Sequence, residues 1–107
     1  RHKTTRRALY ARARAACPEE DEVLLWNERG ELTEFTIGNL VVELDGELWT
    51  PPLECGLLPG IQRAVEVESG KVKERVIMKN ELQRATKIWH INSVRGWTEV
   101  EMIPALG

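Results

Sequence analysis

The order of hydrophobic and polar positions along the chain predicts a mixed α/β fold with a substantial sheet. Short apolar runs, and stretches in which bulky and charged residues alternate, are typical of strands when Gly, Pro, Asn or Asp bounds them. The predicted strands span residues 23–26, 31–35, 40–44, 47–50, 72–77, 88–91 and 98–103. The first is continuously apolar, which predicts burial on both of its faces. Asp45-Gly46 is the strongest hairpin signal in the chain.

Three further stretches predict helices. Residues 5–16 are rich in Ala and Arg and contain neither Gly nor Pro, which favours a helix. Pro59 precedes a second predicted helix, over residues 60–68. Asn80 is a suitable cap for a third helix, over residues 81–86.

The composition is that of one globular domain. The chain has 107 residues, of which 42% are hydrophobic and 30% charged, and a chain of this length buries a modest core. No apolar run approaches the roughly 20 residues that span a bilayer, so a membrane span is excluded and no membrane partner is expected. Cys17 and Cys55 form no CxxC pair, which argues against a metal site or a disulfide framework and favours a cytoplasmic location.

The net charge of −2 hides a basic N-terminal segment. Residues 1–16 contain no acid, and their bases are Arg1, Lys3, Arg6, Arg7, Arg12 and Arg14. Such a cluster suits nucleic acid, the acidic body of the domain or an anionic small molecule. Because no motif for binding RNA or DNA accompanies it, nucleic acid is the least favoured of these partners.

Four segments carry candidate chemistry, although each alone is also an ordinary turn or surface feature. Lys3 lies immediately before the first predicted helix, and Glu34 precedes the turn at Gly38-Asn39. The loop 56–60 leads into a predicted helix N-terminus, where free N–H groups and the helix dipole suit a phosphate. Residues 92–96 offer a hydroxyl and N–H groups to an anion.

In this order the segments resemble the large domain of class IV aminotransferase-like enzymes, which use pyridoxal phosphate and have fold type IV. The matching phrases are HKTTR at 2–6, LLWNERG at 24–30, WTPPLECG at 49–56 and NSVRGW at 92–97. They are most similar to the aminodeoxychorismate lyase segment of bifunctional aminodeoxychorismate synthase/lyase. The resemblance covers nearly the whole chain and implies an α/β fold whose mixed sheet curls into a partial barrel with flanking helices.

The resemblance also assigns roles to residues at the matching positions. Lys3 matches the catalytic lysine, which forms a Schiff base with the cofactor aldehyde and later acts as general base. Glu34 matches the acid that keeps the pyridine nitrogen of pyridoxal 5′-phosphate protonated. The other cofactor-binding positions are Leu58, Gly60, Ile61 and Gln62 in one phosphate-contacting segment, and Asn92, Ser93 and Val94 in a second.

The remaining polar and aromatic residues have more ordinary interpretations. Arg7 and Arg95 are weak candidates for a substrate carboxylate, with surface salt bridges equally favoured. Arg63 is interpreted as structural or charge-balancing, and His90 on its apolar strand as a core histidine. The four tryptophans, Trp26, Trp49, Trp89 and Trp97, are interpreted as core or interface fillers.

The implied reaction is elimination of pyruvate from 4-amino-4-deoxychorismate to give 4-aminobenzoate, on the route to folate. The alternatives are a class IV amino-acid aminotransferase and a non-catalytic fragment that keeps the cofactor-binding fold. Ala8 stands where branched-chain aminotransferases have tyrosine, which weakens the first alternative, and Gln62 stands where many relatives have threonine.

The matching segments lie in the C-terminal large domain of the family. We therefore expect residues 1–107 to form the cofactor-binding domain, without the smaller N-terminal domain. A second copy of the chain or an upstream domain of the same parent protein is the expected partner. The isolated chain is expected to have little activity.

Overall fold

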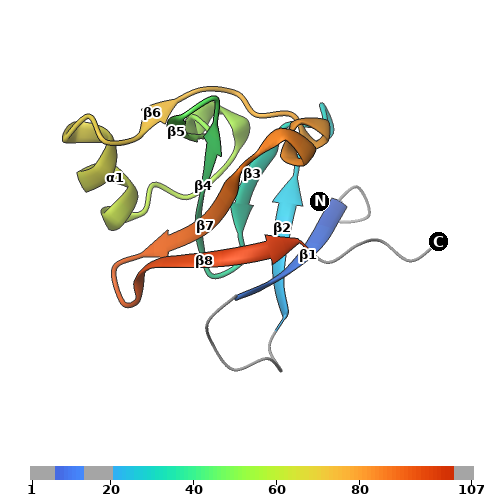
Figure 1. Ribbon diagram of the computed structural model, residues 1–107, viewed down its shortest axis with the longest axis horizontal. Coiled ribbons are helices and arrows are strands. Elements are labelled where there is room, and N and C mark those ends of the chain that lie inside the picture. Colours follow the sequence, from blue (N-terminus) through green and yellow to red (C-terminus); the bar gives the residue numbers. More distant parts are fainter. Residues whose placement is uncertain (1–6, 14–20, 103–107) are drawn as a thin grey trace.

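Strands dominate the computed structural model, which describes residues 7–13 and 21–102 (Figure 1). The strands are β1 (Arg7–Ala13), β2 (Asp21–Trp26), β3 (Leu32–Phe35), β4 (Gly38–Leu44), β5 (Glu47–Thr50), β6 (Lys73–Glu74), β7 (Lys87–Asn92) and β8 (Gly96–Met102). The helices are α1 (Ile61–Glu68) and the 3-10 helices η2 (Leu53–Cys55) and η3 (Lys79–Arg84). None of these helices is long and apolar enough to cross a membrane.

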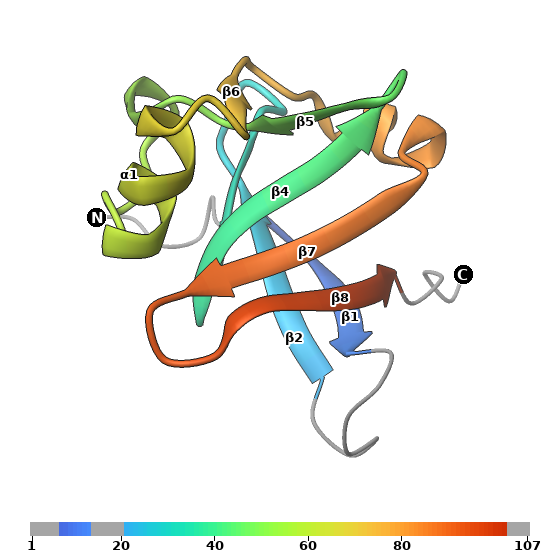
Figure 2. The same ribbon diagram turned by 60° about the vertical axis from the view of Figure 1, so that its left-hand side comes forward.

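Six strands close into a barrel. The order β3-β2-β1-β8-β7-β4 is continuous, and β3 also pairs with β4 through Glu34 opposite Asn39 and Phe35 opposite Gly38. Every pairing in this ring is antiparallel. Figure 2 shows β4, β7 and β8 crossing in front of β1 and β2. The predicted curled sheet is confirmed, and its ring of strands is closed rather than partial.

The connections around β5 follow the local sequence signals. Asp45 and Gly46 have φ of 54° and 81°, and this left-handed turn joins β4 to β5 as predicted. The predicted helix after Pro59 is confirmed as α1, which lies between β5 and β6 in the chain. β5 and β6 pair in parallel, as expected for strands that a helix connects.

The helix predicted over residues 5–16 is wrong where the structure describes it. Residues 7–13 form β1, which pairs with β2 on one side and β8 on the other. Ala11 is fully buried whereas Tyr10 is exposed, which is the alternation of a strand. Helix propensities differ by only a few tenths of a kcal/mol per residue, so pairing with two strands overrides them.

Two smaller predictions also need correction. The strand predicted over 72–77 reduces to Lys73–Glu74, because only these residues find a partner strand in β5. The helix predicted over 81–86 is the 3-10 helix η3, and Met78 rather than Asn80 occupies its N-cap position. The Met78 N–H donates to the Glu81 carboxylate at 2.9 Å, so the acid of the first turn caps this helix.

The core consists of two apolar clusters. The larger includes Leu24, Leu32, Phe35, Leu40, Val42, Leu44, Ile77, Ile88 and Val100, with the half-buried Trp26 and Trp49 packed against it. The smaller contains Val41, Val72 and Ile91, and Trp89 and Trp97 pack against it. The interpretation of the four tryptophans as fillers is therefore confirmed. Among the residues 23–26, Leu24 is fully buried and its neighbours are half-buried.

His90 is fully buried, which confirms its place in the core. Its ring lies edge-on to Phe35, with centroids 5.9 Å apart. Burial, with a smaller contribution from Arg95, lowers the pKa of His90 below its ordinary 6.5.

We therefore expect the stability of the protein to fall in mild acid. Below pH 6.5 His90 is protonated in the unfolded chain but stays neutral in the folded chain. The free energy of unfolding therefore decreases as the pH falls towards the lowered pKa. The slope in this window approaches about 1.4 kcal/mol per pH unit for one proton. Urea unfolding at several pH values measures it. The variant His90→Asn should lose this slope, and an unchanged slope in the variant would contradict the assignment.

Candidate active site

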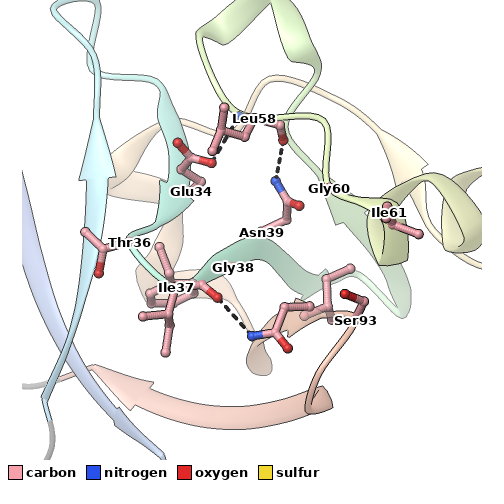
Figure 3. A pocket seen from close by; sticks show the side chains of 12 residues that line it. Glu34, Thr36, Ile37, Gly38, Asn39, Leu58, Gly60, Ile61 and Ser93 are labelled. Carbon is pink, nitrogen blue, oxygen red and sulfur yellow. Dashed lines mark hydrogen bonds between the residues drawn. The ribbon is translucent and has the colours of Figure 1, made fainter.

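A pocket of about 340 Å³ opens where the β3–β4 turn, the loop before α1 and the β7–β8 turn meet (Figure 3). Its lining consists of Glu34, Phe35, Thr36, Ile37, Gly38, Asn39, Leu58, Gly60, Ile61, Ile91, Asn92 and Ser93. These residues come from three separated parts of the chain that the barrel brings together. Six of the cofactor-binding positions implied by the resemblance are among them.

The backbone of Leu58 is held from both sides. Its N–H donates to the Glu34 carboxylate at 3.1 Å, and its carbonyl accepts from the Asn39 side-chain amide at 3.0 Å. Glu34 and Asn39 are opposite each other in the β3–β4 ladder, so one strand pair positions the whole loop. Among the described residues, no hydrogen bond is recorded for the second carboxylate oxygen of Glu34, which leaves it available to a ligand.

Gly60 is required by close packing rather than by its backbone angles. A Cβ atom at this position would lie 2.3 Å from the side-chain oxygen of Asn39. Gly60 is also the residue before α1, and no side chain in the described part of the chain caps that helix with a hydrogen bond. The N–H groups of its first turn, at Ile61 and Gln62, are therefore available donors beside the positive end of the helix dipole.

The turn between β7 and β8 forms the opposite wall. The Asn92 side-chain amide donates to the Ile37 carbonyl at 2.9 Å, and its oxygen accepts from the N–H groups of Val94 and Arg95 at 3.0 and 2.7 Å. The side chain of Asn92 thus fixes the turn to the β3–β4 connection. Ser93 borders the pocket, and its hydroxyl can donate a hydrogen bond.

The structure separates two implied cofactor positions from the pocket. The Gln62 side-chain amide donates to Glu66 at 2.6 Å, and Gln62 does not line the pocket. The side chain of Val94 is 89% exposed and does not border the pocket. The Val94 N–H is occupied by Asn92.

The arginine candidates have different outcomes. Arg63 is 5% exposed, donates to the Pro51 carbonyl at 3.0 Å and forms an ion pair with Glu74, so its structural interpretation is confirmed. Arg95 is exposed and does not border the pocket. Lys3 and the side chain of Arg7 lie outside the described residues.

Asn39 is a pocket residue that the sequence does not single out as functional. It was noted only as part of a Gly-Asn turn, whereas the structure buries it and places its amide between Leu58 and Gly60 (Figure 3). The available signal was a polar residue at the start of an apolar strand, and it does not specify a partner 19 residues away.

A second hollow of about 290 Å³ shares Glu34 with the first and is lined in part by Trp26, Thr33 and Cys55. Burial, followed by the neighbouring Glu31, raises the pKa of the Cys55 thiol to about 11. A thiol with a pKa this high is mainly protonated at neutral pH, and a protonated thiol is poorly suited to nucleophilic catalysis. The described residues contain no cluster of acids, histidines or cysteines suited to a metal ion.

Replacing Gly60 with alanine should displace the loop that carries the pocket. The added methyl group would overlap the Asn39 oxygen, and we expect a loss of about 1–3 kcal/mol in the free energy of unfolding. Chemical denaturation of Gly60→Ala, Asn39→Ala and the double variant measures it. Because Asn39→Ala removes the overlapping atom, the double variant should lose less than the sum of the two. Strict additivity would contradict the overlap.

Comparison with known proteins identifies the class of this domain. The family model described as "Amino-transferase class IV" matches residues 1–103, and the chain belongs to that family. The chain is 34% identical over 101 residues to "Putative aminodeoxychorismate lyase" of Schizosaccharomyces pombe, covering 88% of this chain and 44% of that protein. It is also 34% identical over 88 residues to a Haemophilus influenzae protein, covering 82% and 43% of the two chains.

Solved structures agree with this assignment. "Putative amino-acid aminotransferase" of Mesorhizobium loti superposes with a TM-score of 0.70 at 44% identity, covering 73% of this chain and 38% of that one. "Putative 4-amino-4-deoxychorismate lyase" of Legionella pneumophila superposes with a TM-score of 0.67 at 32% identity, covering 74% and 31%. The chain thus spans less than half the length of these relatives.

Proposed function

We propose that this chain is the cofactor-binding part of a lyase that eliminates pyruvate from 4-amino-4-deoxychorismate to give 4-aminobenzoate. The observation that carries the proposal is the pocket, which sets the Glu34 carboxylate across from the N-terminus of α1. Similarity to the fission yeast and Legionella proteins named as such lyases supports the choice of reaction. Both activity and substrate are proposed for the whole protein.

The donors and acceptors in the pocket fit pyridoxal 5′-phosphate. Figure 3 shows Glu34 on one side of Asn39 and Ile61 and Ser93 on the other. The cofactor has a basic ring nitrogen at one end and a phosphate dianion at the other, so it needs an anion and a cluster of N–H and O–H donors, well separated. Glu34 supplies the first, and the first turn of α1 with Ser93 supplies the second. Leu58 and Ile61 add apolar surface beside the space between them.

Each residue then has a defined task. When bound, pyridoxal 5′-phosphate supplies a ring that accepts electrons from the reacting carbon. Glu34 holds a proton at the ring nitrogen, and its bond to Leu58 keeps the carboxylate in place. The N–H groups of Ile61 and Gln62 bind the phosphate. Lys3 would hold the cofactor through its amine and, once the amine of the substrate had displaced it, would take the proton from the amine-bearing carbon.

Gln62 stands where many relatives have threonine, and its side chain does not line the pocket. Its side chain is engaged with Glu66, so we propose that this chain binds the phosphate here through the backbone N–H alone. The backbone donor does not depend on the side chain, and the substitution is compatible with cofactor binding.

Transamination of an amino acid with a 2-oxo acid is the rival function. The 44% identity to the Mesorhizobium protein named as an amino-acid aminotransferase favours it, while Ala8 at the position of the tyrosine of branched-chain aminotransferases weighs against it. Full-length protein supplied with 4-amino-4-deoxychorismate should release 4-aminobenzoate and pyruvate in equal amounts. Amino-group transfer to 2-oxoglutarate without 4-aminobenzoate would overturn the lyase.

We also propose that the pocket is completed by other chain segments. Leu58 and Ile61 line it and are 71% and 73% exposed, and Val65 continues this apolar surface along α1. A pocket that excludes water needs a cover over these side chains. An upstream domain or a second copy would provide it, which implies little activity for residues 1–107 alone. A cytoplasmic location and a place in folate synthesis belong to the same proposal.

A further inference from the structure

Glu66 joins the two segments that form the proposed phosphate site. It lies on α1, is 9% exposed, and accepts two hydrogen bonds at the same carboxylate oxygen. The Gln62 side-chain amide donates at 2.6 Å, and the Trp97 indole N–H donates at 3.0 Å. Gln62 belongs to the first turn of α1, and Trp97 is the second residue of β8, directly after the turn that carries Ser93. One buried carboxylate therefore connects the helix end to the turn.

Trp97 is itself fixed by its neighbours. Its ring lies edge-on to Trp89 with centroids 5.4 Å apart, and the Lys71 ammonium lies 4.7 Å from its centroid. At the other end of the connection, the Glu66 carbonyl accepts from the Val72 N–H at 3.2 Å. Glu66 and Trp97 are thus each held by contacts outside the pocket. The hydrogen bond between them fixes the position of α1 relative to the start of β8.

We infer that Glu66 is a positioning residue that sets the separation between the α1 N-terminus and the 92–96 turn, and so the affinity for the phosphate group of the cofactor. This rests on the proposed function. Glu66 does not border the pocket, and it acts through Gln62 and Trp97. Donors aimed at a phosphate bind it well only when their spacing is fixed in advance.

The charge of Glu66 has the wrong sign to assist directly. Glu66 lies one helical turn after Gln62, and its carboxylate would repel a phosphate dianion bound at the helix end, so its contribution comes from accepting the two hydrogen bonds. Glutamine at this position retains an acceptor oxygen of the same reach and carries no charge. Alanine retains neither. The pair Glu66→Gln and Glu66→Ala therefore separates positioning from charge.

The test measures dissociation constants of the full-length protein for pyridoxal 5′-phosphate, pyridoxal and inorganic phosphate. Glu66→Ala should weaken binding of the two phosphate-bearing probes by about tenfold and leave pyridoxal unchanged. Glu66→Gln should bind all three about as tightly as the unmodified protein. The Trp97 indole N–H resonance, followed by NMR, should move in Glu66→Ala, as expected for loss of its acceptor.

Glu81→Ala is the matched control. Glu81 also accepts from two donors, Met78 N–H at 2.9 Å and Arg75 at 2.6 Å, and it lies outside the pocket. This variant should be destabilised without change in phosphate selectivity. Equal phosphate affinity in Glu66→Ala and the unmodified protein, or equal weakening of pyridoxal, would overturn the positioning role alone. An unmodified protein that binds none of the three probes would overturn the proposed function together with it.

Discussion

Replacing Lys3 with alanine should abolish turnover by the full-length protein. The proposed function gives this amine two tasks, attachment of the cofactor and removal of the substrate proton, and a positioned base alone contributes roughly 10²–10⁴-fold to a rate. Losing both should lower the rate of 4-aminobenzoate formation by about 10⁴-fold or more. The rate of 4-aminobenzoate formation measures the effect. Borohydride reduction of the unmodified protein loaded with cofactor should leave the cofactor irreversibly attached to Lys3.

Lys87→Ala provides the control for Lys3. Lys87 is an exposed lysine on β7, and it does not border the pocket, so its removal changes the lysine count without touching the site. This variant should keep its activity, and borohydride should still fix the cofactor to Lys3. The role of Lys3 would be contradicted if Lys3→Ala formed 4-aminobenzoate at the normal rate. It would also be contradicted if borohydride fixed the cofactor to another lysine.

Local sequence signals predicted most of the sheet correctly. The Asp45-Gly46 pair has the positive φ angles that a tight hairpin needs, and these residue types tolerate such angles better than most. The helix α1 between β5 and β6 accounts for their parallel pairing. The hairpin signal lies within the turn that it specifies. Contacts with the rest of the chain do not override so local a preference.

The wrong helix over residues 5–16 shows where local signals fail. Ala and Arg favour a helix in isolation, but β1 lies between β2 and β8, and the barrel needs a strand at that place to complete its ring. The strand pairings that decide the matter join Arg7–Ala13 to residues 9 to 91 positions away in sequence. Propensity alone contains no information about those partners.

The candidate site was predictable as a set of residues but not as a connected structure. The resemblance implied Glu34, Leu58 and Ser93, and the barrel brings them to one pocket. The residues that hold the pocket in shape were not predicted. Asn39 and Glu66 act through bonds to residues 19 and 31 positions away, and no short motif encodes such a contact.

Glu34→Gln should separate the two contributions of this acid. The glutamine oxygen can still accept from the Leu58 N–H, so the loop before α1 should keep its position. The negative charge is lost, so under the proposed function the variant would no longer favour a proton at the ring nitrogen of the bound cofactor. We expect a fall of roughly 100-fold in kcat for 4-aminobenzoate formation with little change in cofactor affinity, since removing one preorganised electrostatic group from an active site typically costs this much.

Glu34→Ala should lower cofactor affinity as well as kcat, whereas Glu34→Gln should lower kcat alone. It also removes the acceptor for Leu58, so cofactor affinity should fall along with kcat. Glu31→Gln is the matched control: Glu31 belongs to the same segment, and its hydrogen bond from Asn27 and the neighbouring Arg29 lower its pKa, but it lies outside both hollows. The control loses the same charge and should keep its kcat. If Glu34→Gln and Glu31→Gln have equal kcat values, Glu34 serves only to anchor the loop, and the cofactor ring must be oriented differently in this pocket.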